Sequence, residues 1–273
     1  MKYLIVTADD LGLTKNINEG IAKAYQEGIV KSISVISTGE AFEDAVKVIN
    51  DLKLEEIGAH LALTETRPIL NSSKFYKNHN EFFFNWFLGR IDSEDLYKEL
   101  KAQLDLLKKA GVKITHINSH EHIHMIPDIL NVFIKAAKEY NIPAIRYPRG
   151  DRPPKGFVVG EIYKSFILSY FSKRTENILK KSGLLYTDFF FGLLDGGRLD
   201  EDILLEMLKN LKDGVTEIVT HPGFLSPEVL DSYPWHIGGE TELFALTGSK
   251  VKNAAKINDI KLIKYQEFLS IER

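Results

Sequence analysis

The feature that most constrains this 273-residue chain is a regular alternation between two kinds of segment. Short runs rich in β-branched residues, such as YLIVTA and ISVIS, are each followed by a longer segment whose apolar residues recur at helical spacing. This alternation is typical of repeated βα units around a parallel sheet. The chain therefore predicts an α/β fold.

The βα units follow one another without a linker or an internal repeat. We predict strands at residues 3–8, 30–37, 57–63, 113–118, 143–148, 216–223 and 260–265. Seven or eight such units favour a TIM-like (β/α) barrel of parallel strands, either regular or distorted. We expect this barrel to form a single domain over residues 1–273. An open, doubly wound sheet is the alternative, and it is weakened because no G-x-G-x-x-G motif follows the first strand.

Two stretches, at about residues 64–92 and 151–198, interrupt the alternation. We predict that both are insertions on the catalytic face of the barrel. The first contains an aromatic run from Phe75 to Phe87, which we interpret as an elaborated loop. The second contains Arg-Pro-Pro and Gly-Gly and predicts an irregular segment with one or two helices. Between them, Ser93 is expected to cap a helix that ends at Gly111.

Composition excludes several classes of function. The formal net charge of -3 gives no basic field for nucleic acid. The chain has no cysteine, so any metal must be held by nitrogen and oxygen ligands. The apolar run at the N-terminus is too short for a signal peptide or a membrane span. We therefore expect a cytoplasmic protein with neither a nucleic acid nor a membrane as its partner.

Acidic and imidazole side chains follow four of the apolar runs, in IVTADD, IGAHLAL, ITHINSHEH and EIVTHPG. The carboxyl ends of the strands share one face of a parallel barrel. Asp9, Asp10, His60, His120 and His221 should therefore converge on that face. Each residue alone has an ordinary explanation, such as a solvated turn or a core histidine, but four coincidences on one face favour a metal or catalytic site.

Four of the eight histidines lie in the segment ITHINSHEHIHMIP. Successive strand side chains alternate between faces, so His116, Asn118 and His120 should point to one side. His120 would then reach the rim as a ligand, with His116 deeper, in the core or behind a ligand. We expect His122 and His124, beyond the strand end, to shape the pocket or to orient a ligand.

These motifs together resemble the YdjC family of carbohydrate deacetylases, a family that includes chitooligosaccharide deacetylases, and the resemblance runs nearly end to end. It rests on TADDLGLTKNINEGI, GAHLALT, THINSHEHIHMIP, IRYPR, THPGF and ETEL. The histidine-rich motif is the most specific of them. One departure is Asn118, which stands where the family usually has Asp; an amide can position a neighbouring side chain but supplies no charge.

The resemblance implies a barrel-like fold and a hydrolase that removes an acetyl group from an N-acetylated sugar. It also implies that Asp10, His60 and His120 bind one divalent metal ion and that Asp9 is the general base. Mg²⁺ is the ion that the family implies. Two imidazoles and one carboxylate also suit Zn²⁺, Co²⁺ or Mn²⁺.

Other residues have less defined roles in this hypothesis. His221 is our candidate for the general acid, with His124 as the alternative. Arg146 and Arg149 could bond sugar hydroxyls, and Arg146, Asn118, His122 and His124 could equally support the residues that react. The aromatic residues of the insertions could stack on sugar rings or form the core or a homodimer contact; they are Phe82, Phe83, Trp86, Phe189, Phe190 and Phe191.

Two alternatives to deacetylation stay open. Another single-metal hydrolase, either a phosphoesterase or an amidohydrolase-like enzyme, could gather the same residues at a barrel mouth. A non-catalytic sugar-binding or metal-binding barrel is the third possibility. Assays of acetate and phosphate release would separate the first two, and substitution of Asp9 would test the third.

Overall fold

The computed structural model describes residues 1–70, 74–149, 159–193 and 197–271. The strands are β1 Lys2–Leu11, β2 Ser32–Val35, β3 Ile57–Leu61, β4 Ile114–Ser119, β5 Ala144–Ile145, β6 Phe189–Phe191, β7 Gly214–Thr220 and β8 Ile260–Leu262. The helices are α1 Lys15–Glu27, α2 Phe42–Asp51, α3 His79–Phe87, α4 Ser93–Lys109, α5 Pro127–Glu139, α6 Val159–Ser182, α7 Glu201–Lys209, α8 Pro227–Ser232, α9 Gly239–Thr247, α10 Ser249–Ile257 and α11 Tyr265–Leu269, with 3₁₀ segments η1 His120–Met125 and η2 Pro234–Gly238.

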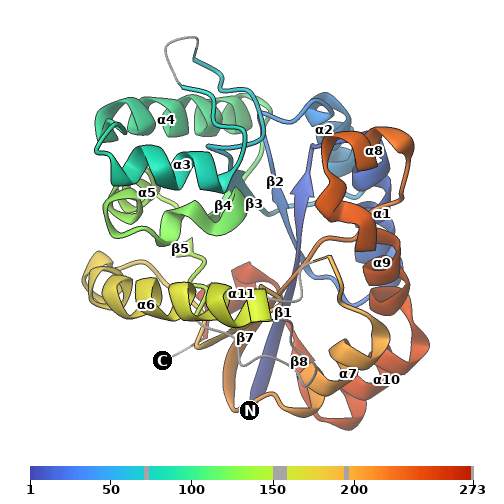
Figure 1. Ribbon diagram of the computed structural model, residues 1–273. Coiled ribbons are helices and arrows are strands. Elements are labelled where there is room, and N and C mark those ends of the chain that lie inside the picture. Colours follow the sequence, from blue (N-terminus) through green and yellow to red (C-terminus); the bar gives the residue numbers. More distant parts are fainter. Residues whose placement is uncertain (71–73, 150–158, 194–196, 272–273) are drawn as a thin grey trace.

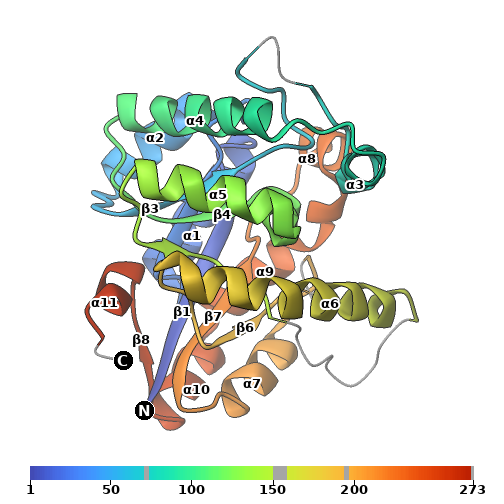
Figure 2. The same cartoon turned by 90° about the vertical axis from the view of Figure 1, so that its left-hand side faces the viewer.

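The strands form one parallel sheet in the order β5-β4-β3-β2-β1-β7-β6. The sheet curls, and the helices lie around its outside (Figures 1 and 2). Leu185, just before β6, forms an isolated parallel bridge with Ala144 of β5, and this bridge links the two edges of the curled sheet. The predicted α/β fold with a parallel, barrel-like sheet is confirmed.

The ring departs from a regular eight-stranded barrel at β8. This strand pairs with Lys2–Leu4 of β1, on the same edge of β1 that β2 occupies further along the strand. The opposite edge of β1 pairs directly with β7. As a result seven strands form the curled sheet, and β8 lies beside the first half of β1.

The two predicted insertions contain more regular structure than we expected. Residues 75–87 include helix α3, because the Asn78 side chain accepts a hydrogen bond from the Glu81 backbone N–H and caps the helix. The second insertion includes α6 and the strand β6. Its residues 150–158 and 194–196, and residues 71–73 of the first insertion, lie outside the described residues.

One capping prediction is wrong by a single position. Helix α4 is capped by Asp92, whose carboxylate accepts hydrogen bonds from the backbone N–H groups of Glu94 and Asp95, and Ser93 is its first helical residue. The predicted end at Gly111 is correct, because this glycine has a φ of +79° just after the helix. Pro127 begins α5, as the sequence predicts.

The inside of the curled sheet is polar next to the carboxyl ends of the strands. Thr7 of β1 and Glu217 of β7 are fully buried and joined by a 2.9 Å hydrogen bond. His116 of β4 is also fully buried, 3.2 Å from the Ser34 hydroxyl of β2. Gly58 of β3 makes room for this ring, since a Cβ at that position would lie 2.2 Å from His116 Nε2.

The apolar core consists of two clusters of buried residues. The larger one joins the sheet to the surrounding helices, and the smaller one packs α11 and Ile263, which directly follows β8, against residues of β1, β5 and β7. Within the described residues, no helix combines the length and the apolar character that a membrane span requires.

Candidate active site

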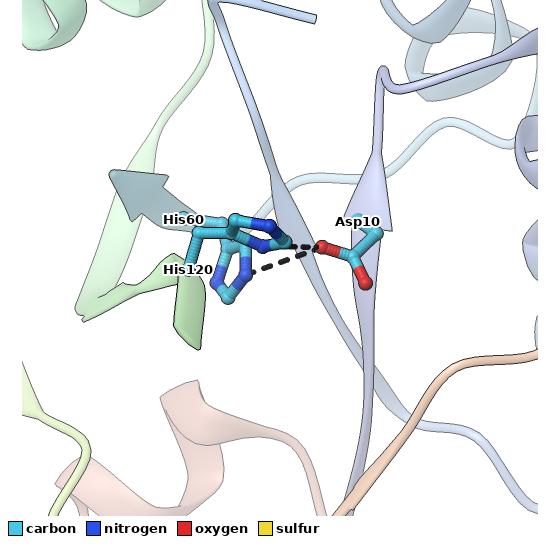
Figure 3. A group of neighbouring side chains, drawn as sticks. All are labelled: Asp10, His60 and His120. Carbon is cyan, nitrogen blue, oxygen red and sulfur yellow. Dashed lines mark hydrogen bonds and ion pairs between the residues drawn. The ribbon is translucent and has the colours of Figure 1, made fainter. Parts of the chain in front are cut away.

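The structure brings together Asp10, His60 and His120 at the carboxyl ends of β1, β3 and β4 (Figure 3). Asp10 Oδ1 lies 3.3 Å from His60 Nε2 and 3.2 Å from His120 Nδ1. One ligand atom from each residue lies within 4.8 Å of the others, and all three side chains are buried. The convergence that the strand ends predict is therefore present in the fold.

The backbone at Asp10 contributes to this arrangement. Its φ is +72°, in the left-handed region that residues other than glycine seldom adopt. Glu65, Glu121 and His122 have φ angles of 63°, 54° and 53°. Such conformations cost about 1–3 kcal/mol each and often occur at functional sites. Four residues in or beside the site are thus in the left-handed region.

The tautomer of His60 is fixed by Asn118. The Asn118 amide nitrogen donates to Asp9 Oδ1 at 3.3 Å and to the Ser34 hydroxyl at 3.1 Å. Because a carboxylate can only accept, the amide oxygen faces the other way and accepts from His60 Nδ1–H at 2.8 Å. The lone pair of neutral His60 is consequently on Nε2, the nitrogen that faces Asp10.

His120 has the opposite orientation. Its Nε2 donates to Glu65 Oε2 at 2.9 Å, and its Nδ1 faces Asp10 Oδ1. Burial lowers the pKa of His120, but hydrogen bonds and charge from Asp10 and Glu65 outweigh burial and raise its pKa well above the ordinary value. Without a metal ion, a proton on Nδ1 therefore bridges His120 to Asp10.

These contacts make the donor set suitable for a cation. Their other nitrogens are used, so in the neutral rings His60 Nε2 and His120 Nδ1 would both direct a lone pair at the same oxygen of Asp10. Lone pairs that face each other at 3.2–3.3 Å require a proton or a metal ion between them. Burial would raise the pKa of Asp10, yet its histidine partners hold that pKa well below the usual value, so the carboxylate is available as a ligand.

Asp9 lies beside the triad and is paired with Arg146. The guanidinium bonds both carboxylate oxygens, by Nη1 to Oδ2 and by Nη2 to Oδ1 at 3.0 Å. Its Nε and Nη2 also donate to Glu217 at 3.0 and 2.8 Å. Burial raises the pKa of Asp9, but Arg146 and then His60 lower it, so its net pKa is well below the usual value.

Arg146 is fully buried, and its bonds to Asp9 and Glu217 occupy the guanidinium. Of the two roles that the sequence leaves open for this arginine, the structure favours support of Asp9 over contact with sugar hydroxyls. Arg149 lies over the rings of Tyr147 and Tyr186, at 4.9 and 5.8 Å from their centroids.

His221 follows β7 and packs against η2. Its ring lies perpendicular to Trp235 and to His236, with centroids 5.7 and 6.2 Å away. Among the described residues, His221 Nδ1 has no hydrogen-bond partner. Burial lowers the pKa of His221 to about 4, against the opposing charges of Asp10 and Asp9. Its backbone N–H donates to Glu242 Oε2 at 2.6 Å.

His124 has both ring nitrogens in use. Its Nε2 donates to the Arg146 carbonyl at 3.1 Å, so its Nδ1 accepts from the Ser119 hydroxyl at 2.5 Å. This residue thus supports the backbone below the site and is poorly placed as a general acid. His122 is packed against His124 and Phe190, 6.2 and 5.9 Å between ring centroids. His116 is fully buried and stacked on Tyr265 at 3.6 Å, in agreement with the expected core position.

The aromatic residues of the insertions mostly pack within the protein. Phe82 is fully buried against Tyr76, so it is not available to a sugar. Phe83 and Trp86 contact Phe171 of α6, at 6.1 and 6.2 Å between centroids. In β6, Phe190 is buried, and Phe189 and Phe191 are half-buried. The core interpretation holds for Phe82 and Phe190.

The sequence interpretation missed three residues at the site. Glu65 bonds His120, and the Trp235 indole N–H donates to the same Glu65 oxygen at 3.1 Å. His236 Nε2 lies 3.5 Å from Asp10 Oδ2, on the side opposite His60 and His120. The sequence signals for these residues are weak. Trp235 and His236 are neighbours in PWHIG, and Glu65 directly follows the motif GAHLALT.

Comparison with known proteins connects this geometry to a family. The profile of the family described as "YdjC-like protein" matches residues 3–256. A carbohydrate deacetylase of Brevibacillus brevis is 32% identical over 267 residues, which cover 97% of this chain and 98% of that protein. A carbohydrate deacetylase of Vibrio cholerae is 29% identical over 272 residues, with 98% and 96% covered.

A solved structure shares the same fold. A protein of Enterococcus faecalis, named in its crystal structure for cellobiose-phosphate cleavage, superposes with a TM-score of 0.79 at 23% identity. The match covers 98% of both chains. At this identity the likeness shows the fold alone.

Proposed function

Because the chain belongs to the YdjC-like protein family, we propose that it is a metal-dependent carbohydrate deacetylase that removes the acetyl group from an N-acetylated sugar such as a chitooligosaccharide. The observation that carries this proposal is the buried meeting of Asp10, His60 and His120 at the carboxyl ends of three strands. The curated relatives named carbohydrate deacetylase support the reaction class.

In this proposal Asp10 Oδ1, His60 Nε2 and His120 Nδ1 hold one divalent ion. The ion supplies a Lewis acid for the amide carbonyl and for the attacking water. Mg²⁺ follows from the family resemblance, whereas the two imidazoles suit Zn²⁺, Co²⁺ or Mn²⁺ at least as well.

Asp9 is the proposed general base. Its two oxygens accept three hydrogen bonds, from Arg146 twice and from Asn118 once. A carboxylate has about four acceptor positions, so one remains for the attacking water. The low pKa keeps Asp9 ionised, and the paired carboxylate orients the water and receives its proton in the transition state.

His221 is the proposed general acid. Cleavage of the C–N bond releases acetate and an amine, and the amine nitrogen must gain a proton. Both ring nitrogens of His124 have partners, whereas His221 Nδ1 has none among the described residues, so His221 is the better candidate. Because the pKa of His221 is lowered to about 4, the ring is neutral at pH 7, and the proton that it delivers must come from the attacking water during the same turnover.

The assay that tests the proposal measures acetate release from N-acetylglucosamine oligomers with Mg²⁺, Mn²⁺, Co²⁺ and Zn²⁺ supplied in turn. Phosphate release from a generic phosphomonoester is measured on the same preparations. We expect acetate release that depends on the added ion and no phosphate release above background. Phosphate release without acetate release would favour a phosphoesterase and overturn the proposal.

Three further predictions concern location and partners. We propose a cytoplasmic protein whose partner is a small N-acetylated sugar, and a homodimer in which exposed aromatic residues of α3 contribute to the contact. Phe84 and Phe87 support the last point because they are 60% and 81% exposed. Light scattering after size exclusion measures the oligomeric state, and a mass of one chain would overturn the dimer.

A further inference from the structure

Glu65 lies in the loop after β3, and its carboxylate is held by specific hydrogen bonds. It is the single carboxylate bonded to His120 Nε2 in the described structure, and its own exposure is 17%. Its backbone is left-handed, with a φ of 63°, and its N–H donates to the Tyr76 carbonyl at 2.9 Å. The strained backbone is thus held where the carboxylate reaches His120.

Trp235 holds the other side of this carboxylate. Its indole N–H donates to Glu65 Oε2 at 3.1 Å, so one oxygen receives hydrogen bonds from both Trp235 and His120. The Trp235 ring also lies 5.7 Å from the His120 ring. Residues 65, 120 and 235 come from three separate segments, and together they leave the His120 ring little freedom to turn.

The consequence concerns which nitrogen of His120 binds the ion. A histidine that donates Nε2–H to a carboxylate can offer only Nδ1 to a metal, and such partners raise ligand basicity and fix the ring. His60 is arranged the other way, since Asn118 takes its Nδ1 and leaves Nε2. The two imidazoles therefore meet the same Asp10 oxygen through different nitrogens.

We propose that Glu65, held by the Trp235 indole, is a positioning residue that makes His120 bind the divalent ion through Nδ1 while His60 binds it through Nε2. This inference rests on the metal site of the proposed function. Neither residue touches the reacting atoms in this assignment; both act through His120.

The first test measures the affinity of purified protein for Zn²⁺ alone, by competition with a chromophoric chelator. Loss of the side chain that hydrogen-bonds a metal-ligating histidine typically weakens metal affinity by about 10–100-fold. We expect a loss in that range for Glu65→Ala, a smaller loss for Glu65→Gln, and a loss for Trp235→Phe, which removes the N–H donor and keeps the ring. Glu206→Gln, an exposed carboxylate on α7, is the matched control and should bind as the parent does.

The second test identifies the ligating nitrogens. Long-range ¹H–¹⁵N spectra of the Zn²⁺-loaded, histidine-labelled protein distinguish Nδ1 from Nε2 ligation, and His60→Gln and His120→Gln variants assign the two rings. We expect Nε2 of His120 to keep its proton and Nδ1 to bind Zn²⁺.

The outcomes separate the inference from the proposed function. If the parent binds Zn²⁺ and releases acetate, but Glu65→Ala binds Zn²⁺ as tightly or His120 binds through Nε2, the inference is wrong and the deacetylase proposal stands. If the parent binds no divalent ion at all, both are wrong. Circular dichroism shows whether Glu65→Ala keeps its fold. If it does not, the Zn²⁺ affinity of Glu65→Gln and the ¹H–¹⁵N spectrum of the parent protein decide whether the inference is right.

Discussion

Individual residues at this site act through the hydrogen bonds that fix their orientation. The strand-end pattern predicts that Asp10, His60 and His120 meet, and they do. It cannot predict which nitrogen each ring presents, because that depends on Asn118 from the same strand end as His120 and on Glu65 from a loop. The Asn118 amide orients two neighbours at once, because its oxygen accepts a hydrogen bond from His60 and its nitrogen donates one to Asp9.

Substitution of Asp9 by Asn tests the assignment of the general base. The amide keeps the shape of the side chain but cannot take a proton from water, and general bases typically contribute about 10²–10⁴-fold in rate. We expect kcat for acetate release to fall by that order while the metal content stays at one ion per chain. Unchanged turnover would exclude Asp9 as the base, and turnover absent from the parent as well would favour the non-catalytic alternative.

The pH dependence of stability tests the environment of His120. In the metal-free protein its pKa is raised above the ordinary value of 6.5, so its bridging proton stabilises the fold fully below pH 6.5 and progressively less as the pH rises through the raised pKa. We expect Tm of the chelator-treated protein to fall above pH 6.5.

Metal should reverse this trend, since the ion replaces the proton on Nδ1 and binds better as the proton is lost. The difference in Tm between metal-loaded and chelated protein should therefore increase with pH. His120→Gln should remove the dependence. A chelated parent that becomes more stable above pH 6.5 would contradict the proposed proton bridge.

At the scale of elements, the sequence predicts the strands that begin a clear βα unit and misses the elements inside the two expected insertions. The seven predicted strands all correspond to strands of the sheet, because each begins a clear βα unit. Strand β6, Phe189–Phe191, was missed because it lies within the stretch 151–198, which the sequence predicts as an irregular insertion. Helix α3 was missed because its consecutive aromatic residues show no helical period, so that Asn78, its capping residue, is its main sequence signal.

Gly58 provides a test of how closely β2, β3 and β4 pack. An alanine Cβ there would lie 2.2 Å from His116 Nε2 and 2.6 Å from Ser34 Oγ. His116 cannot easily move away because its ring is stacked on Tyr265. We expect Gly58→Ala to lower the free energy of unfolding by about 1–3 kcal/mol in a urea titration.

The control for this prediction is a double-mutant cycle with His116→Ala. Removal of the ring should relieve the crowding, so the cost of Gly58→Ala should shrink in that background. An equal cost in both backgrounds would show that the crowding with His116 is not its cause.

The whole molecule concentrates negative charge beneath the mouth of its curled sheet. Asp9, Asp10, Arg146 and Glu217 are all at most 1% exposed. Three carboxylates and one guanidinium sum to a charge of -2 when all are ionised, and buried charge of this kind requires compensation. A divalent ion at Asp10 would balance that charge. The closure of the sheet is what brings these groups together from strands far apart in the sequence.

Diffraction from crystals grown with Co²⁺ or Zn²⁺, measured at the absorption edge of the ion, tests the central claim most directly. The account predicts one anomalous peak that Asp10 Oδ1, His60 Nε2 and His120 Nδ1 share, at about 2.0–2.2 Å from each atom if the ion is zinc. A peak elsewhere, or no peak in crystals soaked at saturating ion concentration, would contradict it.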